Sequence, residues 1–202
     1  MYAEMLVTGQ RPGSTGKIPM RSSKDGHAVV MDGHARYQQA VIDGRVWIGS
    51  NLGGTPVTTQ AALSATTPAL TLYNPVGSGV NLVLWEFGYS FAAAPAAASQ
   101  VVLAYNLLNA TPPTLTTLAN VVNAGTFTGS PIGQCARVST LSAAPLALKY
   151  VGGTTGAAAI SGYPTIYDCA GSIVLPPGVA LSVQTVGAAS LTAHFSWEEV
   201  NI

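Results

Sequence analysis

Charge is the scarcest property of this 202-residue chain. Only eight basic and eight acidic residues are present, 8% of the total, whereas a typical soluble domain has roughly 25%. A soluble monomer normally keeps more surface charge than this to stay dispersed. The composition therefore predicts that other protein covers much of the surface, in an oligomer or a larger shell. A threonine-rich surface that stays in solution is the alternative explanation.

Other absences narrow the function classes. The formal net charge is zero, so the basic stripe typical of nucleic-acid binding is missing. No apolar run approaches the ~20 residues of a membrane span. The first ten residues lack the basic and apolar regions of a secretory signal. We therefore expect no nucleic-acid partner and no membrane partner.

Cysteine and histidine are also rare. Cys135 and Cys169 are too few for a disulfide framework; reduced core or interface thiols are the favoured interpretation, and one bridge between neighbouring strands is the alternative. His27 and His34 each follow an Asp-Gly pair, but their spacing matches no metal site. No local signature supports a pairing of either thiol with His194 as nucleophile and base. We expect no cofactor, no metal and no catalytic residue.

The charges that are present concentrate near the start of the chain, where the first 50 residues hold ten of the sixteen. A stretch of Gly, Thr, Ala and Pro with almost no bulky residues follows, as in an extended connector. Strand patterns then recur from Ala69 onward. We therefore predict an N-terminal arm over residues 1–50, an extended linker over 51–68 and a body over 69–202.

The body has the pattern of short strands separated by turns. An apolar run over 172–175 stops at Pro176, which has no N–H for a ladder. Pro177 and Gly178 then suit a type II turn. Further strands are predicted at 69–73, 81–91, 99–107, 114–122, 134–141, 146–151, 179–185 and 191–197, and a long loop at 152–163. Frequent Gly and Pro with no amphipathic helix predict an all-β sandwich, and the strand count favours a jelly roll over an immunoglobulin-like fold.

Aromatic residues alternate along the two longest predicted strands. On 81–91 a single predicted face runs from Val83 to Phe91 through every second residue, and the last strand shows the same period. We expect these aromatic side chains to pack in the core or at a contact between subunits: Trp85, Phe87, Tyr89, Phe91, Phe195 and Trp197.

Three segments resemble small virion structural proteins of tailed bacteriophages. They are ALTLYNPVGSGVNLVL at 69–84, GSIVLPPGVALSVQT at 171–185 and FSWEEV at 195–200, and the segment 25–37 is similar too. The resemblance implies a capsid decoration, or cement, protein without enzymatic activity. It implies a jelly-roll-like body that forms a homotrimer, an arm that grips the capsid lattice, and a place on the outer capsid surface of a virion assembled in the host cytoplasm.

The major capsid protein is the partner that this resemblance implies. Basic side chains of the arm can pair with acidic or polar groups on such a shell, and the predicted capsid contacts are Arg11, Lys17, Arg21, Lys24, Arg36 and Arg45. The alternative is a tail-associated or host-receptor-binding β-sandwich module of a phage. Carbohydrate recognition by such a module would favour exposed loop aromatics, for which Tyr163 and Tyr167 are the candidates.

Overall fold

The structure is a computed structural model that describes residues 8–9, 18–19, 38–51, 55–107, 111–155 and 164–202. The chain divides into two compact units, residues 1–38 and 39–202. In the first unit, strands β1 (Thr8–Gly9) and β2 (Ile18–Pro19) pair antiparallel. The other predicted features of the arm before residue 38, including its five basic residues, lie outside the described residues.

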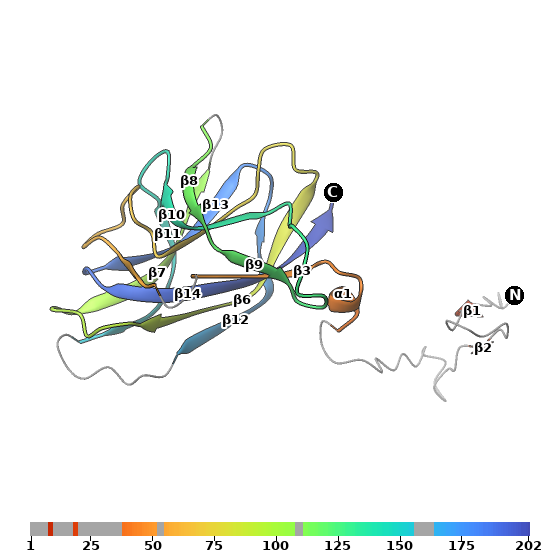
Figure 1. Cartoon of the computed structure of the whole chain (residues 1–202), viewed down its shortest axis with the longest axis horizontal. Coiled ribbons are helices and arrows are strands. Elements are labelled where there is room, and N and C mark those ends of the chain that lie inside the picture. Colours follow the sequence, from red (N-terminus) through yellow and green to blue (C-terminus); the bar gives the residue numbers. More distant parts are fainter. Residues whose placement is uncertain (1–7, 10–17, 20–37, 52–54, 108–110, 156–163) are drawn as a thin grey trace, which may run out of the picture. The chain divides into compact units, whose positions relative to one another are not determined.

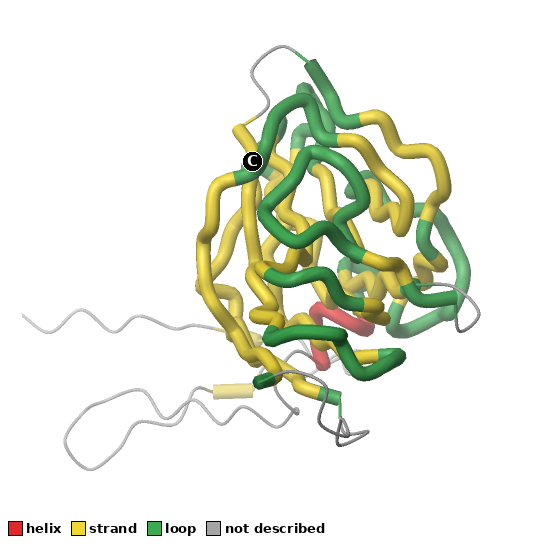
Figure 2. Tube along the Cα trace, turned by 90° about the vertical axis from the view of Figure 1, so that its left-hand side faces the viewer, coloured by secondary structure: helices red, strands yellow, loops and turns green. Residues whose placement is uncertain are grey.

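The second unit is built from two antiparallel sheets (Figures 1 and 2). The β7 sheet has the strand order β11 (Leu146–Thr154), β7 (Ser99–Leu107), β13 (Val179–Val186), β5 (Leu70–Tyr73), β10 (Gln134–Thr140) and β8 (Thr114–Leu118). The β6 sheet has the order β12 (Thr165–Leu175), β6 (Val80–Phe91), β14 (Ser190–Asn201), β3 (Val46–Ser50) and β9 (Asn120–Asn123), and β4 (Val57–Thr58) pairs with β14. A short helix, α1 (Gln38–Ile42), precedes β3. The prediction of an all-β sandwich is confirmed.

The strand pairing explains the jelly-roll character. β5 pairs with β13, β6 with β12, β7 with β11 and β8 with β10, so the pairs are nested along the chain. A ribbon folded this way, with successive pairs alternating between two sheets, is the plan of a jelly roll. Here the first three pairs alternate, but β8 and β10 stay in the β7 sheet because β10 also pairs with β5. In the resulting strand orders, β11 lies at one edge of the β7 sheet and β12 lies at one edge of the β6 sheet.

The turn between β12 and β13 has the predicted chemistry. β12 ends at Leu175, directly before Pro176. Gly178 has a φ of 86°, which is the conformation that a type II turn requires at its second central position. The N–H of Val179 donates to the carbonyl of Pro176 at 3.3 Å. This turn transfers the chain from one sheet to the other.

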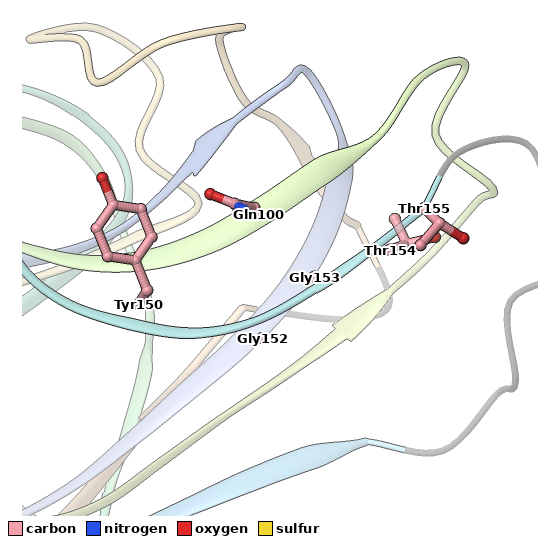
Figure 3. Close-up of a pocket in the computed structure, with 6 residues that line it drawn as sticks. All are labelled: Gln100, Tyr150, Gly152, Gly153, Thr154 and Thr155. Atoms are coloured by element: carbon pink, nitrogen blue, oxygen red, sulfur yellow. The ribbon is translucent and has the colours of Figure 1, made fainter.

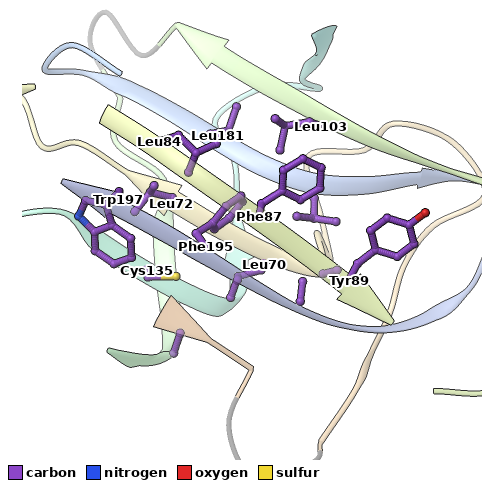
Figure 4. Packing of buried hydrophobic residues seen from close by; sticks show 14 of the residues in the cluster. Leu70, Leu72, Leu84, Phe87, Tyr89, Leu103, Cys135, Leu181, Phe195 and Trp197 are labelled. Atoms are coloured by element: carbon purple, nitrogen blue, oxygen red, sulfur yellow. The ribbon is translucent and has the colours of Figure 1, made fainter. Parts of the chain in front are cut away.

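The core lies between the two sheets (Figure 4). Phe87, Phe195 and Trp197 are fully buried, and the rings of Phe87 and Phe195 lie 6.3 Å apart between centroids. Tyr89 belongs to the same cluster, and Phe91 packs at its margin. Burying each such side chain contributes about 1.5–3 kcal/mol. Five of the six aromatic residues singled out in the sequence thus lie in or against the core.

Trp85 does not share the face of its predicted neighbours. Consecutive residues of β14 pair with Leu84 and Glu86, which leaves Trp85 as the extra residue of a β-bulge. One extra residue reverses the alternation of side chains. Leu84 faces the core before the bulge and Phe87 after it, whereas Trp85 is buried outside the core cluster. The single alternating face predicted for this strand is therefore wrong.

Residues 59–67 cover the outer face of the β7 sheet through uncharged hydrogen bonds. The side chain of Gln184 accepts from the N–H of Ser64 at 3.3 Å and donates to its carbonyl at 3.1 Å. At the end of the same strand, on its core-facing side, the Thr185 hydroxyl donates to the carbonyl of Gln60 at 3.0 Å. Buried polar groups are tolerated when they are paired in this way. The sandwich unit thus includes these residues, β3 and β4, all upstream of the predicted start of the body.

Candidate interaction surfaces

Arg45 is the one predicted capsid contact that the described residues include. Its guanidinium donates to the carboxylate of Glu198 and lies 3.3 Å from that of Asp43. Ion pairs near a protein surface contribute only about 0–1 kcal/mol, but these two pairings already satisfy the charge of Arg45 within the chain. The ion pairs of Arg45 do not test the other five predicted contacts, because those residues lie outside the described residues.

Acidic side chains gather on the outer face of the β6 sheet. Glu86 lies opposite Asp168 in the register of β6 and β12, and Glu198 follows on β14. His194 Nε2 is 3.7 Å from Glu86 Oε1, and the Ser196 hydroxyl donates to the same oxygen at 3.3 Å. We call Glu86, Asp168 and Glu198 the acidic face.

The two units of the chain carry opposite net charge. Residues 1–38 hold five basic and three acidic residues, and residues 39–202 hold three basic and five acidic residues. Half of all charges thus fall in less than a fifth of the chain. A partner that binds the first unit through ion pairs needs acidic or polar groups.

The edge strands expose large apolar side chains. On β11, Leu146, Leu148 and Tyr150 are 61%, 46% and 61% exposed, and on β12, Ile166 and Val174 are 59% and 49% exposed. Edge strands of monomeric proteins usually carry charges or prolines that prevent association. β11 has a single such charge, a lysine, and no proline. These edges are the surface that the sequence analysis missed.

That lysine, on β11, contacts a tyrosine of the other edge strand, β12. Lys149 donates a hydrogen bond to the Tyr167 hydroxyl, and its Nζ lies 4.4 Å from the centroid of the Tyr167 ring. The Tyr167 ring also packs against Phe87, at 5.6 Å between centroids. Tyr167, one of the two loop aromatics proposed for carbohydrate recognition, is therefore a packed residue of β12. Tyr163 lies outside the described residues.

Glu199 is a partly buried acid beside the loop that precedes β10. Its carboxylate accepts a hydrogen bond of 2.7 Å from the N–H of Gly133. Burial raises the pKa of Glu199, and the hydrogen bond from Gly133 opposes part of this rise. A cleft of about 800 Å³ is lined by uncharged residues of this loop, of β8 and of β9. The cleft thus offers no acid and base pair.

We expect Glu199→Gln to flatten the pH dependence of stability. A carboxyl whose folded pKa exceeds its unfolded pKa stabilises the fold in acid, and this contribution is lost as pH rises through the folded pKa. Glutamine stays neutral and keeps an acceptor for Gly133. Denaturant unfolding across acidic to neutral pH should therefore show a smaller loss for the variant than for the wild type. The same pH dependence of stability in the variant and the wild type would contradict a raised pKa of Glu199.

Glu198→Gln is the matched control for this measurement. It neutralises the adjacent residue on the opposite face of β14, where the carboxylate accepts from Arg45. We expect it to lower stability slightly at neutral pH, because a formed ion pair is lost. At neutral pH, Glu199→Gln should therefore raise stability and Glu198→Gln should lower it. This difference in sign distinguishes a buried acid from one held in an ion pair.

The two thiols are free and buried. Burial raises the pKa of Cys169 to about 11 and raises the pKa of Cys135 further, so both thiols stay protonated at neutral pH. Both belong to the core cluster, whereas His194 lies between the core residues Ala193 and Phe195 and so faces outward. The structure does not bring this histidine to either thiol.

Within the described part of the chain, no three His, Cys, Asp or Glu side chains converge in a way that would hold a metal ion. The described residues contain no helix long and apolar enough to span a membrane. No family model, curated protein or solved structure matches the chain.

Proposed function

We propose that this chain is a non-enzymatic virion structural protein, a capsid decoration protein that binds the major capsid protein on the outer surface of a phage shell as a homotrimer. The division of the chain supports this most directly. A compact, weakly charged sandwich is joined to an N-terminal unit that holds eight of the sixteen charges and a basic excess. The sequence resemblance points to the same class.

Such a protein stabilises a shell because it binds the assembled form of the capsid protein and not the free subunits. A ligand that binds only the assembled form adds its binding free energy to that form, about 2.7 kcal/mol when the free ligand is at a hundred times its dissociation constant. A trimer that contacts several capsid subunits at once multiplies this effect through a high local concentration. The basic residues of the first unit supply the attraction, and the sandwich supplies a rigid body.

The surface of the sandwich favours an assembly over an isolated chain. β11 and β12 expose apolar side chains, and few charges surround them. Obligate interfaces commonly bury about 2,000–5,000 Å² and are more apolar than ordinary surface. We place the tail-associated or receptor-binding alternative second, because Tyr167 is packed against Phe87 and is not available as a binding platform.

A density map of the intact virus particle tests the proposal. We expect the sandwich on the outer capsid surface, in three copies around a common axis and in contact with more than one major capsid protein subunit. Density for the chain in the tail would favour the alternative. A particle that lacks the chain altogether would refute both.

A further inference from the structure

Strand β11 has two unlike halves. Its first half carries the exposed side chains of Leu146 and Leu148. Its second half runs through Gly152 and Gly153 and leaves a shallow hollow of about 590 Å³, bounded also by Gln100, Tyr150, Thr154 and Thr155 (Figure 3). The strand therefore presents apolar bulk at one end and an open space at the other.

Packing beneath the strand requires the two glycines. A Cβ at Gly152 would lie 1.8 Å from the hydroxyl oxygen of Tyr89, and a Cβ at Gly153 would lie 2.6 Å from the carbonyl oxygen of Ser99. Tyr89 is a core residue and Ser99 belongs to the neighbouring strand β7. The hollow is thus a fixed consequence of how the sandwich is packed.

Charge indicates what can cover this edge. Across a two-fold axis, two copies of one surface bring identical charges together, so a charged surface repels its own copy and an uncharged surface does not. Lys149 is the one charged residue of β11, and it is turned onto Tyr167. The acidic face on the other sheet would instead bring like charges together. The β11 edge is therefore suited to a second copy of this chain.

The shape of β11 favours association through side chains over a continued sheet. The register of β11 against β7 shifts between Ala147 and Lys149 and again between Tyr150 and Gly152. Bulges of this kind twist an edge strand and interrupt the ladder that a further strand would need. Apolar side chains that fill a hollow need no such ladder.

We propose that β11 is the surface through which copies of this chain meet, with Leu146 and Leu148 of one copy seated in the hollow beside Tyr150 of another. This inference rests on the proposed function only for the number of copies. Contact in both directions between two chains gives a two-fold dimer, and contact in one direction from chain to chain gives a closed ring such as a trimer.

Sedimentation equilibrium of the full chain tests the surface. We expect an oligomer for the wild type and for Val174→Glu, a matched control that places the same charge at a similarly exposed position on β12, 49% against 46% for Leu148. Leu148→Glu should weaken association at least about tenfold, because a carboxylate would be buried without a partner. Thr155→Trp should do the same by filling the hollow.

A mixture of the two weakened variants tests the mode of contact. The Thr155→Trp chain keeps its leucines and the Leu148→Glu chain keeps its hollow, so one intact contact remains between them. We expect the mixture to form a heterodimer that neither variant forms alone. No association in the mixture would overturn the seating of the leucines in the hollow.

The outcomes separate this surface from the proposed function. An oligomer that both variants leave intact, or a monomeric wild type, overturns the surface, and capsid binding measured by co-sedimentation then judges the function independently. A wild-type dimer that both variants dissociate supports the surface and overturns the trimer.

Discussion

A chain that lacks residues 1–37 is expected to lose its binding to capsids while its sandwich unfolds at an unchanged temperature. The truncation removes five of the six predicted contacts, and the sixth, Arg45, is engaged by Glu198 and Asp43. Co-sedimentation with particles measures the loss, and circular dichroism on heating measures the fold.

The structure also fixes where the cut should fall. Ala40 is buried, and the side chain of Asn123 donates to the carbonyl of Gly44 at 2.7 Å. A longer deletion that reached residue 45 would remove these contacts and the Arg45 ion pairs. It would then mix a loss of stability with a loss of binding. A cut before Gln38 keeps α1 and everything after it.

Two sets of substitutions in the full chain serve as controls for the truncation. Glutamine at the five basic positions should weaken capsid binding and reduce its dependence on salt, because screening acts on ion pairs between exposed charges. Neutral replacements of the three acidic residues of the same unit should preserve or strengthen it. The basic positions are Arg11, Lys17, Arg21, Lys24 and Arg36, and the acidic positions are Glu4, Asp25 and Asp32. Full capsid binding by the truncated chain would refute the assignment of the arm.

Trp197→Ala is expected to lower the free energy of unfolding by about 3–5 kcal/mol, since it removes a large aromatic side chain from a filled core. Trp197 is fully buried and lies opposite Trp47 in the pairing of β14 with β3. Gly49 and Gly133 approach the indole so closely that a Cβ on either would lie 3.1 Å from it. Backbone on two sides of the ring limits how far the cavity can collapse.

Urea unfolding measures this cost, and Phe127→Ala is the control. Phe127 is also aromatic but is 71% exposed, so its truncation should change stability by no more than about 0.5 kcal/mol. Equal effects of the two substitutions would show that the core does not lie between the sheets as described.

Local sequence was sufficient where a strand obeys one period and ends at a specific residue. The end of β12 before Pro176, the turn at Gly178 and the alternation of β14 all follow from chemistry within a few residues. The bulge at Trp85 could not be predicted, because an extra residue is defined only against partner strands far away in the chain. The extension of β11 to Thr154, into a predicted loop, depends likewise on its pairing with β7.

The candidate surfaces were harder to predict than the fold. The run from Leu146 to Val151 has apolar residues on both faces and a single charge, Lys149, which is close to the pattern of a buried central strand. Only the strand order shows that this strand lies at an edge. The pairing of Arg45 with Glu198 joins residues 153 positions apart, and no local spacing indicates it. The sequence also gives no sign that Tyr167 belongs to a strand, because the residues that pair with it and pack on it come from β6 and β11.

The nested ribbon also governs when this protein can fold. Its outermost pair joins Leu70 to Val183, and β14, which pairs with both β6 and β3, is the last strand of the chain. Contacts between residues so distant along the chain make folding slow, because the intervening segment must be closed into a loop first. The β6 sheet therefore cannot close during synthesis until the C-terminal strand has left the ribosome, and a nascent chain halted before residue 190 has no strand to join β6 to β3.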